Sequence, residues 1–267
     1  MISMPWRSRL TSDVAQIRTC FIMLLVMFVL FSALFYYVLI RYDHELNELK
    51  GRLHRLESTF DEIVKIINSR TPLGKENLAE LIIVNEDIKR ISSKIYSGNF
   101  TSDLITYTHW VFSSINYTED SFYPMIFGNV TLIRDFWQSS VETIDMGKGD
   151  CEDFAILLAS LIRASYEKAD VYIVTLSIPG NSEGHAALMA IWNGSAYIAD
   201  PTLDRVYMLG DSMKSIKRNI NRWFSDFGGI DVKVSFIVGK SKDGKNVYMS
   251  FSSNLEFINW VSTVALS

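Results

Sequence analysis

The sequence predicts an α+β fold, in which a helix precedes a sheet of antiparallel strands. The helix is expected over residues 151–164, because their apolar side chains recur at helical spacing. Alternating or continuous apolar stretches predict strands at residues 171–178, 185–192, 196–200, 232–238 and 247–251. Asn193-Gly194 and Asp243-Gly244, dipeptides that favour tight hairpin turns, each separate two of these strands. Strands joined by such turns are antiparallel neighbours.

The overall composition indicates a folded domain that does not bind nucleic acid. Of the 267 residues, 48% are hydrophobic, which is enough to build a sizeable buried core. The formal net charge is -4, and Lys and Arg are dispersed along the chain, so no basic patch attracts a polyanion. A disulfide is not expected, because Cys20 lies in an apolar N-terminal stretch and Cys151 lies deep in the predicted domain.

Residues 19–40 form an uncharged, strongly apolar stretch, TCFIMLLVMFVLFSALFYYVLI. As a helix rising about 1.5 Å per residue it covers roughly 33 Å, which is enough to span the core of a bilayer. A cleaved signal peptide is the alternative, but its apolar region is shorter, and no clear small-x-small cleavage site follows this stretch. We therefore expect an uncleaved transmembrane helix that anchors the chain in the cell membrane.

The residues on the two sides of this helix indicate its orientation. Arg7, Arg9 and Arg18 precede it, whereas basic and acidic residues are mixed after it. Asn-x-Ser/Thr acceptor sites for N-glycosylation lie after it, at Asn99, Asn116, Asn129 and Asn193. Both features favour an N-terminus inside the cell and a glycosylated domain outside it.

The segment that follows the apolar stretch has the pattern of a coiled coil. Its apolar residues alternate steps of three and four, at Tyr42, Leu46, Leu49, Leu53, Leu56, Phe60, Ile63 and Ile67. Charged residues fill the other positions, and Thr71-Pro72 ends the helix. The apolar seam over residues 42–67 can pair with a second copy, giving a homo-oligomer, or dock on the chain's own domain. The pattern leaves both alternatives open.

The chain therefore divides into five predicted segments. An N-terminal tail (1–18) and the transmembrane helix (19–40) precede the coiled-coil helix (41–70), a helical stalk (71–100) and the globular domain (101–267). The stalk is expected to contain one amphipathic helix over about residues 75–97, which ends at Gly98-Asn99. Thr101 or Ser102 is expected to cap the first helix of the domain.

Cys151 lies where a helix is expected to begin. The preceding residues are Gly147-Lys148-Gly149-Asp150, and Asp150 is a suitable N-cap. A cysteine in the first helical turn is close to unpaired amides and to the positive end of the helix dipole, which favour the thiolate. We therefore expect a reactive cysteine with a lowered pKa. The alternative is an inert buried cysteine, which is common in protein cores.

His185 and Asp200 lie on the two strands that flank Asn193-Gly194. Pairing Trp192 with Ser195 across that turn makes Asp200 a diagonal neighbour of His185 on the same face of the hairpin. A shift of one residue would place the two side chains on opposite faces. The sequence thus predicts that His185 and Asp200 are within side-chain reach of each other.

These motifs resemble the transglutaminase-like superfamily. The resemblance rests on GKGDCEDFAILLASLIRA and GHAALMAIWNGSAYIADPT, and more weakly on ITYTHWVFSSINYTED and DFWQSSVETIDMGKGD. It covers roughly residues 103–202 and implies a papain-like core, in which the helix bearing the cysteine packs on an antiparallel sheet. It also implies a catalytic triad, with Cys151 as nucleophile, His185 as general base and Asp200 as the group that orients the imidazole.

Two further positions have counterparts in the family. Asp153 matches an acidic residue that follows the cysteine, and its expected role here is to stabilise the first helical turn. Trp137 or Gln138 is a candidate for an upstream residue on the oxyanion side of the site, although the spacing to Cys151 is long.

The implied activity is acyl transfer at a peptide or side-chain amide through a thioester. Hydrolysis would make the chain a protease or amidase, and capture by an amine would make it a transglutaminase. No cofactor and no metal are expected, because His44, His54 and His109 lack a zinc-binding context and no calcium-loop motif occurs. The alternative function is a non-catalytic, membrane-tethered assembly or binding module with a relic triad.

Overall fold

The computed structural model describes residues 6–120, 123–127, 129–133, 135–178, 184–227 and 232–266. The chain divides into two compact units, Met1–Ile63 and Val64–Ser267. The first unit consists of most of one long helix. The second contains the sheet, the remaining helices and all the residues predicted to form the site.

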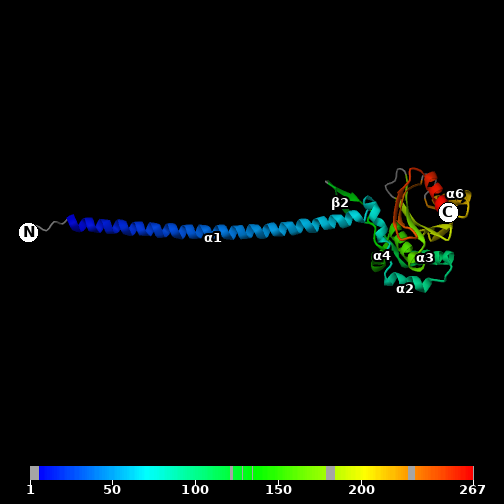
Figure 1. Cartoon of the computed structure of the whole chain (residues 1–267), viewed down its shortest axis with the longest axis horizontal. Helices are drawn as coiled ribbons and strands as arrows, with labels where there is room; N and C mark the ends of the chain where they lie inside the picture. The colour runs from blue at the N-terminus through cyan, green and yellow to red at the C-terminus, as the bar shows by residue number, and fades with distance from the viewer. Residues whose placement is uncertain are drawn as a thin grey trace, which may run out of the picture. The chain divides into compact units, whose positions relative to one another are not determined.

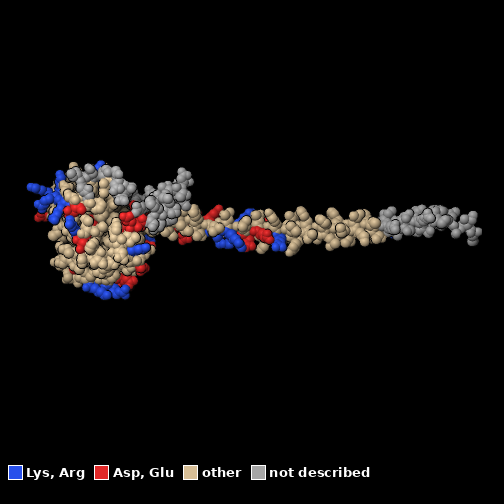
Figure 2. Space-filling view, turned by 180° about the vertical axis from the view of Figure 1, so that it is seen from behind, with Lys and Arg blue, Asp and Glu red and all other residues tan. Residues whose placement is uncertain are grey.

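Helix α1 (Trp6–Ser69) is continuous through the apolar stretch and the heptad segment (Figure 1). Within the described residues it is the one helix long and apolar enough to cross a membrane, with a mean hydropathy of 2.6 in its most apolar window. Figure 2 shows an uncharged stretch of α1 followed by mixed Lys, Arg, Asp and Glu. A membrane anchor and a signal sequence both fit this helix.

The heptad positions of α1 are exposed in the single chain. From Tyr42 to Ile63 their relative accessibilities lie between 40% at Leu46 and 70% at Tyr42. The helix ends at Ser69, and Thr71-Pro72 follows, as the sequence predicts. The apolar seam thus remains available for pairing.

The prediction of a single stalk helix over residues 75–97 is wrong. The structure has a 3-10 helix, η1 (Pro72–Leu81), and a separate α-helix, α2 (Glu86–Ile95). The break occurs because Asn85 caps α2, its Oδ1 accepting a hydrogen bond of 2.9 Å from the Ile88 amide. Nor is this segment a free stalk, because Leu78 and Ile88 are buried in the core of the second unit.

The second unit is built on a six-stranded antiparallel sheet of order β10-β9-β5-β6-β7-β8. Its strands are β5 (Asp170–Ser177), β6 (Gly184–Trp192), β7 (Ser195–Asp200), β8 (Arg205–Met208), β9 (Lys233–Lys240) and β10 (Asn246–Ser250). The α+β fold is therefore confirmed. Asn193 and Gly194 both have positive φ, 48° and 75°, as a tight two-residue hairpin requires.

Helices cover both faces of the sheet. Helix α5 (Cys151–Ser165) packs with η1, α2 and α3 (Phe100–Ser114) on the face that holds Val171 and Ile173 of β5. Helices α6 (Met213–Phe227) and α7 (Asn254–Leu266) pack on the opposite face, with Tyr172 and Val174. The strand alternation thus separates two apolar clusters, one on each side.

Shorter elements lie before α5. Strand β1 (Asn116–Tyr117) pairs in parallel with β4 (Lys148–Gly149), β2 (Tyr123–Phe127) and β3 (Asn129–Ile133) form a hairpin, and α4 is Ser140–Met146. A capping box of Ser139 and Glu142 begins α4. The cap of α3 is Asn99, whose Oδ1 accepts a hydrogen bond from the Ser102 amide, rather than Thr101 or Ser102 as predicted.

Candidate active site

Cys151 is the first residue of α5, as predicted. The chain approaches this helix through Gly149, where an added Cβ would lie 2.7 Å from the Cβ of Asp153. Any larger residue at this position would push the first turn of α5 away from the preceding strand, β4. The approach therefore requires glycine and fixes the position of the cysteine that follows.

The surroundings of Cys151 oppose the predicted lowering of its pKa. Cys151 is 9% exposed, and its thiol donates a hydrogen bond of 3.1 Å to Oε2 of Glu152. Burial, followed by the nearby carboxyls of Glu152 and Asp150, raises the pKa of the Cys151 thiol well above its ordinary value. The prediction rested on the unpaired amides and the helix dipole, and here burial and the acidic neighbours outweigh both.

The sulfur of Cys151 lies against β6. The backbone amide of Ala186 donates a hydrogen bond to it, which partly offsets the rise in the thiol pKa. Ala186 directly follows His185 in the chain, so the start of α5 meets the start of β6 beside the predicted base. Cys151 thus lies beside the residue that follows His185 in the chain.

The predicted register of the hairpin is confirmed. Trp192 pairs with Ser195, and the ladder continues to Leu188 and Ala199. His185 and Asp200 are both buried, and Nε2 of His185 lies 2.7 Å from Oδ2 of Asp200. Because Nε2 is bonded to the carboxylate, Nδ1 is the ring nitrogen left for a second partner.

Asp200 is held from several directions. Its Oδ1 accepts hydrogen bonds of 3.2 Å from the backbone amides of Thr202 and Leu203, which lie in the turn after β7. Its Oδ2 accepts a further bond of 2.8 Å from Nε1 of Trp223 on α6. A carboxylate with this many N–H donors is held in one orientation.

Asp153 stabilises the first turn of α5, as predicted, by accepting a hydrogen bond from the backbone of the N-cap residue, Asp150. It is fully buried, its Oδ1 accepts a 2.7 Å hydrogen bond from the Gln138 amide, and its Oδ2 accepts a 3.3 Å bond from the Asp150 amide. Burial, and then the charge of Asp150, raise the pKa of Asp153 to about 8. The residue thus also joins the segment before α4 to the start of α5.

The two candidates for an oxyanion-side residue lie in this same segment. Trp137 is buried, and its Nε1 donates a 2.6 Å hydrogen bond to Oδ1 of Asp135. Oε1 of Gln138 is buried and has no hydrogen-bond partner among the described residues. Neither contact assigns an oxyanion donor, so that role stays a prediction.

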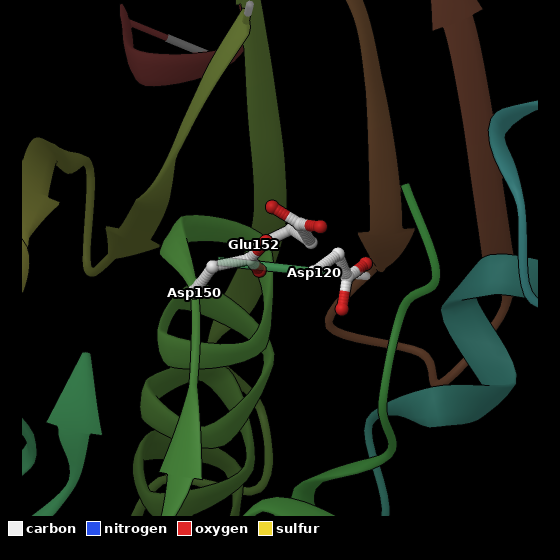
Figure 3. Close-up of side chains that lie close together, drawn as sticks. All are labelled: Asp120, Asp150 and Glu152. Carbon is white, nitrogen blue, oxygen red and sulfur yellow. The ribbon is translucent and has the colours of Figure 1, made fainter. Parts of the chain in front are cut away.

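An acidic cluster that is not expected from the sequence flanks the cysteine. Asp120, Asp150 and Glu152 each offer a carboxylate oxygen, and these atoms lie within 4.8 Å of one another (Figure 3). Burial raises the pKa of Asp150 to about 7, and Oδ1 of Asp150 has no hydrogen-bond partner among the described residues. A set of oxygen donors such as this can hold a hard cation such as Ca²⁺, but not zinc in its preferred N/S coordination.

The sequence indicates two of the three residues of this cluster. Asp150 and Glu152 flank the cysteine in the motif GDCED, which is visible in the sequence. Asp120 precedes them by a long stretch that contains β2, β3 and α4, and only the fold brings it close.

Comparison with known families identifies the domain. A family model described as a transglutaminase-like domain matches residues 86–223. No curated protein matches the chain.

Solved structures of bacterial proteins also match the chain. A protein of Cytophaga hutchinsonii described as a candidate cysteine protease is 17% identical, with a TM-score of 0.34, and the match covers 67% of this chain and 57% of that one. Legionella pneumophila LapG is 19% identical, with a TM-score of 0.36 and coverage of 69% and 96%. A calcium-bound structure of LapG is 21% identical, with a TM-score of 0.33 and coverage of 58% and 83%. The chain thus spans little more than half the length of the Cytophaga protein.

Proposed function

Because the chain belongs to the transglutaminase-like domain family, we propose that it is a membrane-anchored thiol enzyme that acts on peptide or side-chain amides. The triad would consist of Cys151, His185 and Asp200. The observation that supports this assignment most directly is the buried 2.7 Å contact between Nε2 of His185 and Oδ2 of Asp200. It leaves Nδ1 of the imidazole for Cys151, which lies beside the residue that follows His185.

In the first half of the reaction, His185 takes the thiol proton and the sulfur of Cys151 attacks the amide carbonyl carbon. A C–S bond forms, and the negative charge on the carbonyl oxygen is stabilised by amides at the start of α5, which have no acceptor within the helix. The C–N bond then breaks as His185 returns its proton to the leaving amine. Asp200 stabilises the imidazolium throughout and fixes its tautomer.

In the second half, an acceptor attacks the thioester. His185 removes a proton from water or from a primary amine, the acceptor bonds to the acyl carbon, and the C–S bond breaks to regenerate the thiol. Water gives a carboxylic acid, as in a peptidase or amidase. An amine gives a new amide, as in a transglutaminase.

A single assay distinguishes these outcomes. The full chain in a non-ionic detergent is incubated with β-casein and dansylcadaverine, and the products are analysed by mass spectrometry. Dansyl-labelled glutamine indicates transfer, deamidated glutamine indicates side-chain hydrolysis, and new chain ends indicate proteolysis. Cys151→Ala should abolish the activity, whereas Cys20→Ala, at the other cysteine, should leave it unchanged.

The absence of all three products, together with wild-type biological function in Cys151→Ala cells, would favour the alternative of a non-catalytic tethered module. Products formed equally by Cys151→Ala would assign the activity to another residue. Either result overturns the thiol-enzyme proposal.

The acidic cluster favours a second function in the same region, which is binding of a hard divalent cation. Asp150 supplies the specific observation, because a buried carboxylate oxygen without a hydrogen-bond partner among the described residues is costly unless something pairs with it. Asp120 and Glu152 would complete a three-carboxylate set, with water or backbone oxygens filling the remaining positions.

The residues on the two sides of the apolar stretch of α1 support an orientation in the membrane. We propose that α1 is an uncleaved anchor with the enzyme domain outside the cell, on the basis of the arginines before it and the Asn-x-Ser/Thr sites after it. Protease added to intact cells should then remove the domain. Its survival while a known external protein is digested would reverse the orientation.

A further inference from the structure

The last turns of α6 lie against the predicted base and its carboxylate. Apolar residues of this helix recur at helical spacing and pack on the sheet, at Ile216, Ile220, Trp223, Phe224 and Phe227. Trp223 is fully buried and donates its indole N–H to Oδ2 of Asp200 at 2.8 Å. This is the same oxygen that contacts Nε2 of His185. One carboxylate oxygen is therefore held between a helix and a strand.

Phe227, one turn after Trp223, contacts the imidazole itself. The ring centroids of Phe227 and His185 are 3.8 Å apart, and the two planes differ by 12°. Residues four apart lie on the same face of a helix, so α6 presents the indole to the carboxylate and the phenyl ring to the imidazole. A stacked phenyl ring limits rotation of the imidazole about its Cβ–Cγ bond.

The same turn of α6 is tied to the strand next to Asp200. Tyr207 of β8 donates its hydroxyl hydrogen to Oδ2 of Asp226 at 2.9 Å, and Nη1 of Arg205 lies 2.7 Å from that oxygen. Arg205 pairs directly with Asp200 in the β7–β8 ladder. The position of the helix end relative to Asp200 is thus set by short contacts on both sides.

We infer that Trp223 and Phe227 are positioning residues for the base, with Trp223 orienting the Asp200 carboxylate and Phe227 fixing the plane of the His185 ring. The inference rests on the proposed function, because it gives these contacts a catalytic purpose. Neither residue touches the reacting atoms. Each acts through a member of the triad.

NMR of the histidine rings tests these contacts directly and does not require turnover of a substrate. The chain has four histidines, so the full protein in detergent, labelled at histidine, gives few imidazole signals by NMR at one fixed pH. His44, His54 and His109 are exposed and serve as internal references. In the wild type, stacking on Phe227 should shift the ring protons of His185 upfield, and the bond to Asp200 should place its Nε2 proton at low field.

Two substitutions remove one contact each. Phe227→Leu should abolish the upfield shift, Phe227→Tyr should retain it, and Phe224→Leu, on the same helix, should leave it unchanged. Trp223→Phe removes the N–H donor but keeps an aromatic ring, and should move the Nε2 proton of His185. Trp260→Phe is the matched control, since Trp260 packs on the same side of the sheet through Tyr172.

Turnover of β-casein provides the second readout. A hydrogen bond to a charged acceptor is worth enough that Trp223→Phe should lower kcat about tenfold or more, while KM changes little. Unchanged His185 signals in both Trp223→Phe and Phe227→Leu would overturn the inference. If the His185 signals change in these variants but the wild type turns over no substrate, the proposed function is overturned. The positioning contacts then stand.

Discussion

Nε2 of His185 lies 2.7 Å from Oδ2 of Asp200, and the two side chains are 3% and 0% exposed. Few solvent molecules can share this contact, so the carboxylate rather than water determines the orientation of the ring. The consequences of changing either residue should therefore be large and specific.

Asp200→Asn should lower turnover by at least about a hundredfold, because the amide neither stabilises an imidazolium nor enforces the tautomer that the thiol requires. It also places an amide N–H₂ group among the N–H donors of Thr202, Leu203 and Trp223, which should cost about 1–3 kcal/mol of stability. Turnover and thermal unfolding of the full chain provide the two measurements. Asp243→Asn, on an exposed turn, is the control, and equal losses in both variants would contradict the prediction.

The sequence was sufficient to predict this pair because its determinants are local. Asn193-Gly194 sets the hairpin turn, and the turn sets the register that places His185 and Asp200 on one face. The position of Cys151 at a helix start is equally predictable from the sequence, since glycines and an N-cap precede an apolar helical stripe. These signals depend only on residues near one another in the chain.

The contacts that surround the proposed triad depend instead on tertiary packing. Trp223 looks like an ordinary core residue in the sequence, and only the position of α6 under the sheet places its indole on Asp200. Tertiary packing also brings Asp120 close to Asp150 and Glu152. The break between η1 and α2 is hard to predict, because Asn85 lies inside a helical pattern and only its side-chain bond to the Ile88 amide makes it an N-cap.

Gly149→Ala should destabilise the domain by about 1–3 kcal/mol, because the added methyl group would lie 2.7 Å from Cβ of Asp153 in a site that cannot expand freely. Thermal unfolding measures the loss. Gly51→Ala is the matched control, since its new methyl group would find only Arg55 Nη1 at 3.8 Å and a helix interior favours alanine. Equal melting temperatures for the two variants would show that the first turn of α5 yields to the methyl group.

Protonation of Asp103 at low pH should destabilise the domain. Burial tends to raise the pKa of Asp103, but hydrogen bonds from Ser97, Tyr166 and the Gly98 amide outweigh it and leave the pKa below its ordinary value. A lowered pKa contributes stability that is present above the unfolded value of about 3.9 and is lost as pH falls through the folded value.

Denaturant unfolding between pH 2 and 6 tests this contribution. Asp103→Asn should be less stable than the wild type at pH 6, and the difference should shrink toward pH 2, where the wild-type carboxyl is protonated as well. Asp243→Asn again provides the control. A constant difference between Asp103→Asn and the wild type over the whole range would show that the charge of Asp103 is not involved.

Calcium should raise the melting temperature of the wild-type chain after treatment with a chelator, because a ligand that binds only the folded state stabilises it. Glu152→Gln should abolish that rise. It should also raise the melting temperature of the calcium-free protein, since it removes one of several crowded carboxyls. Glu167→Gln, an exposed control, should keep the response to calcium. A wild type that is unaffected by both Ca²⁺ and Mg²⁺ would exclude the cation site.

The seam on α1 should hold two or more copies of the chain together. Its side chains are exposed in the single chain, from Leu46 to Ile63, and apolar seams of this spacing are covered by a partner helix in coiled coils. A shared membrane would raise the local concentration of the copies and favour such pairing.

Leu53→Lys combined with Leu56→Lys should dissociate the assembly, because pairing would then bury four or more ammonium groups in an apolar interface. Analytical ultracentrifugation of the full chain in a density-matched detergent gives the mass of the protein in each complex. Asn47→Lys combined with Ser58→Lys adds the same charge on exposed positions away from the seam and should leave the assembly intact. A wild-type chain that sediments as a monomer at concentrations typical of a membrane would rule out pairing. The seam of α1 would then require a different partner, and the chain's own domain would be the remaining alternative that the sequence leaves open.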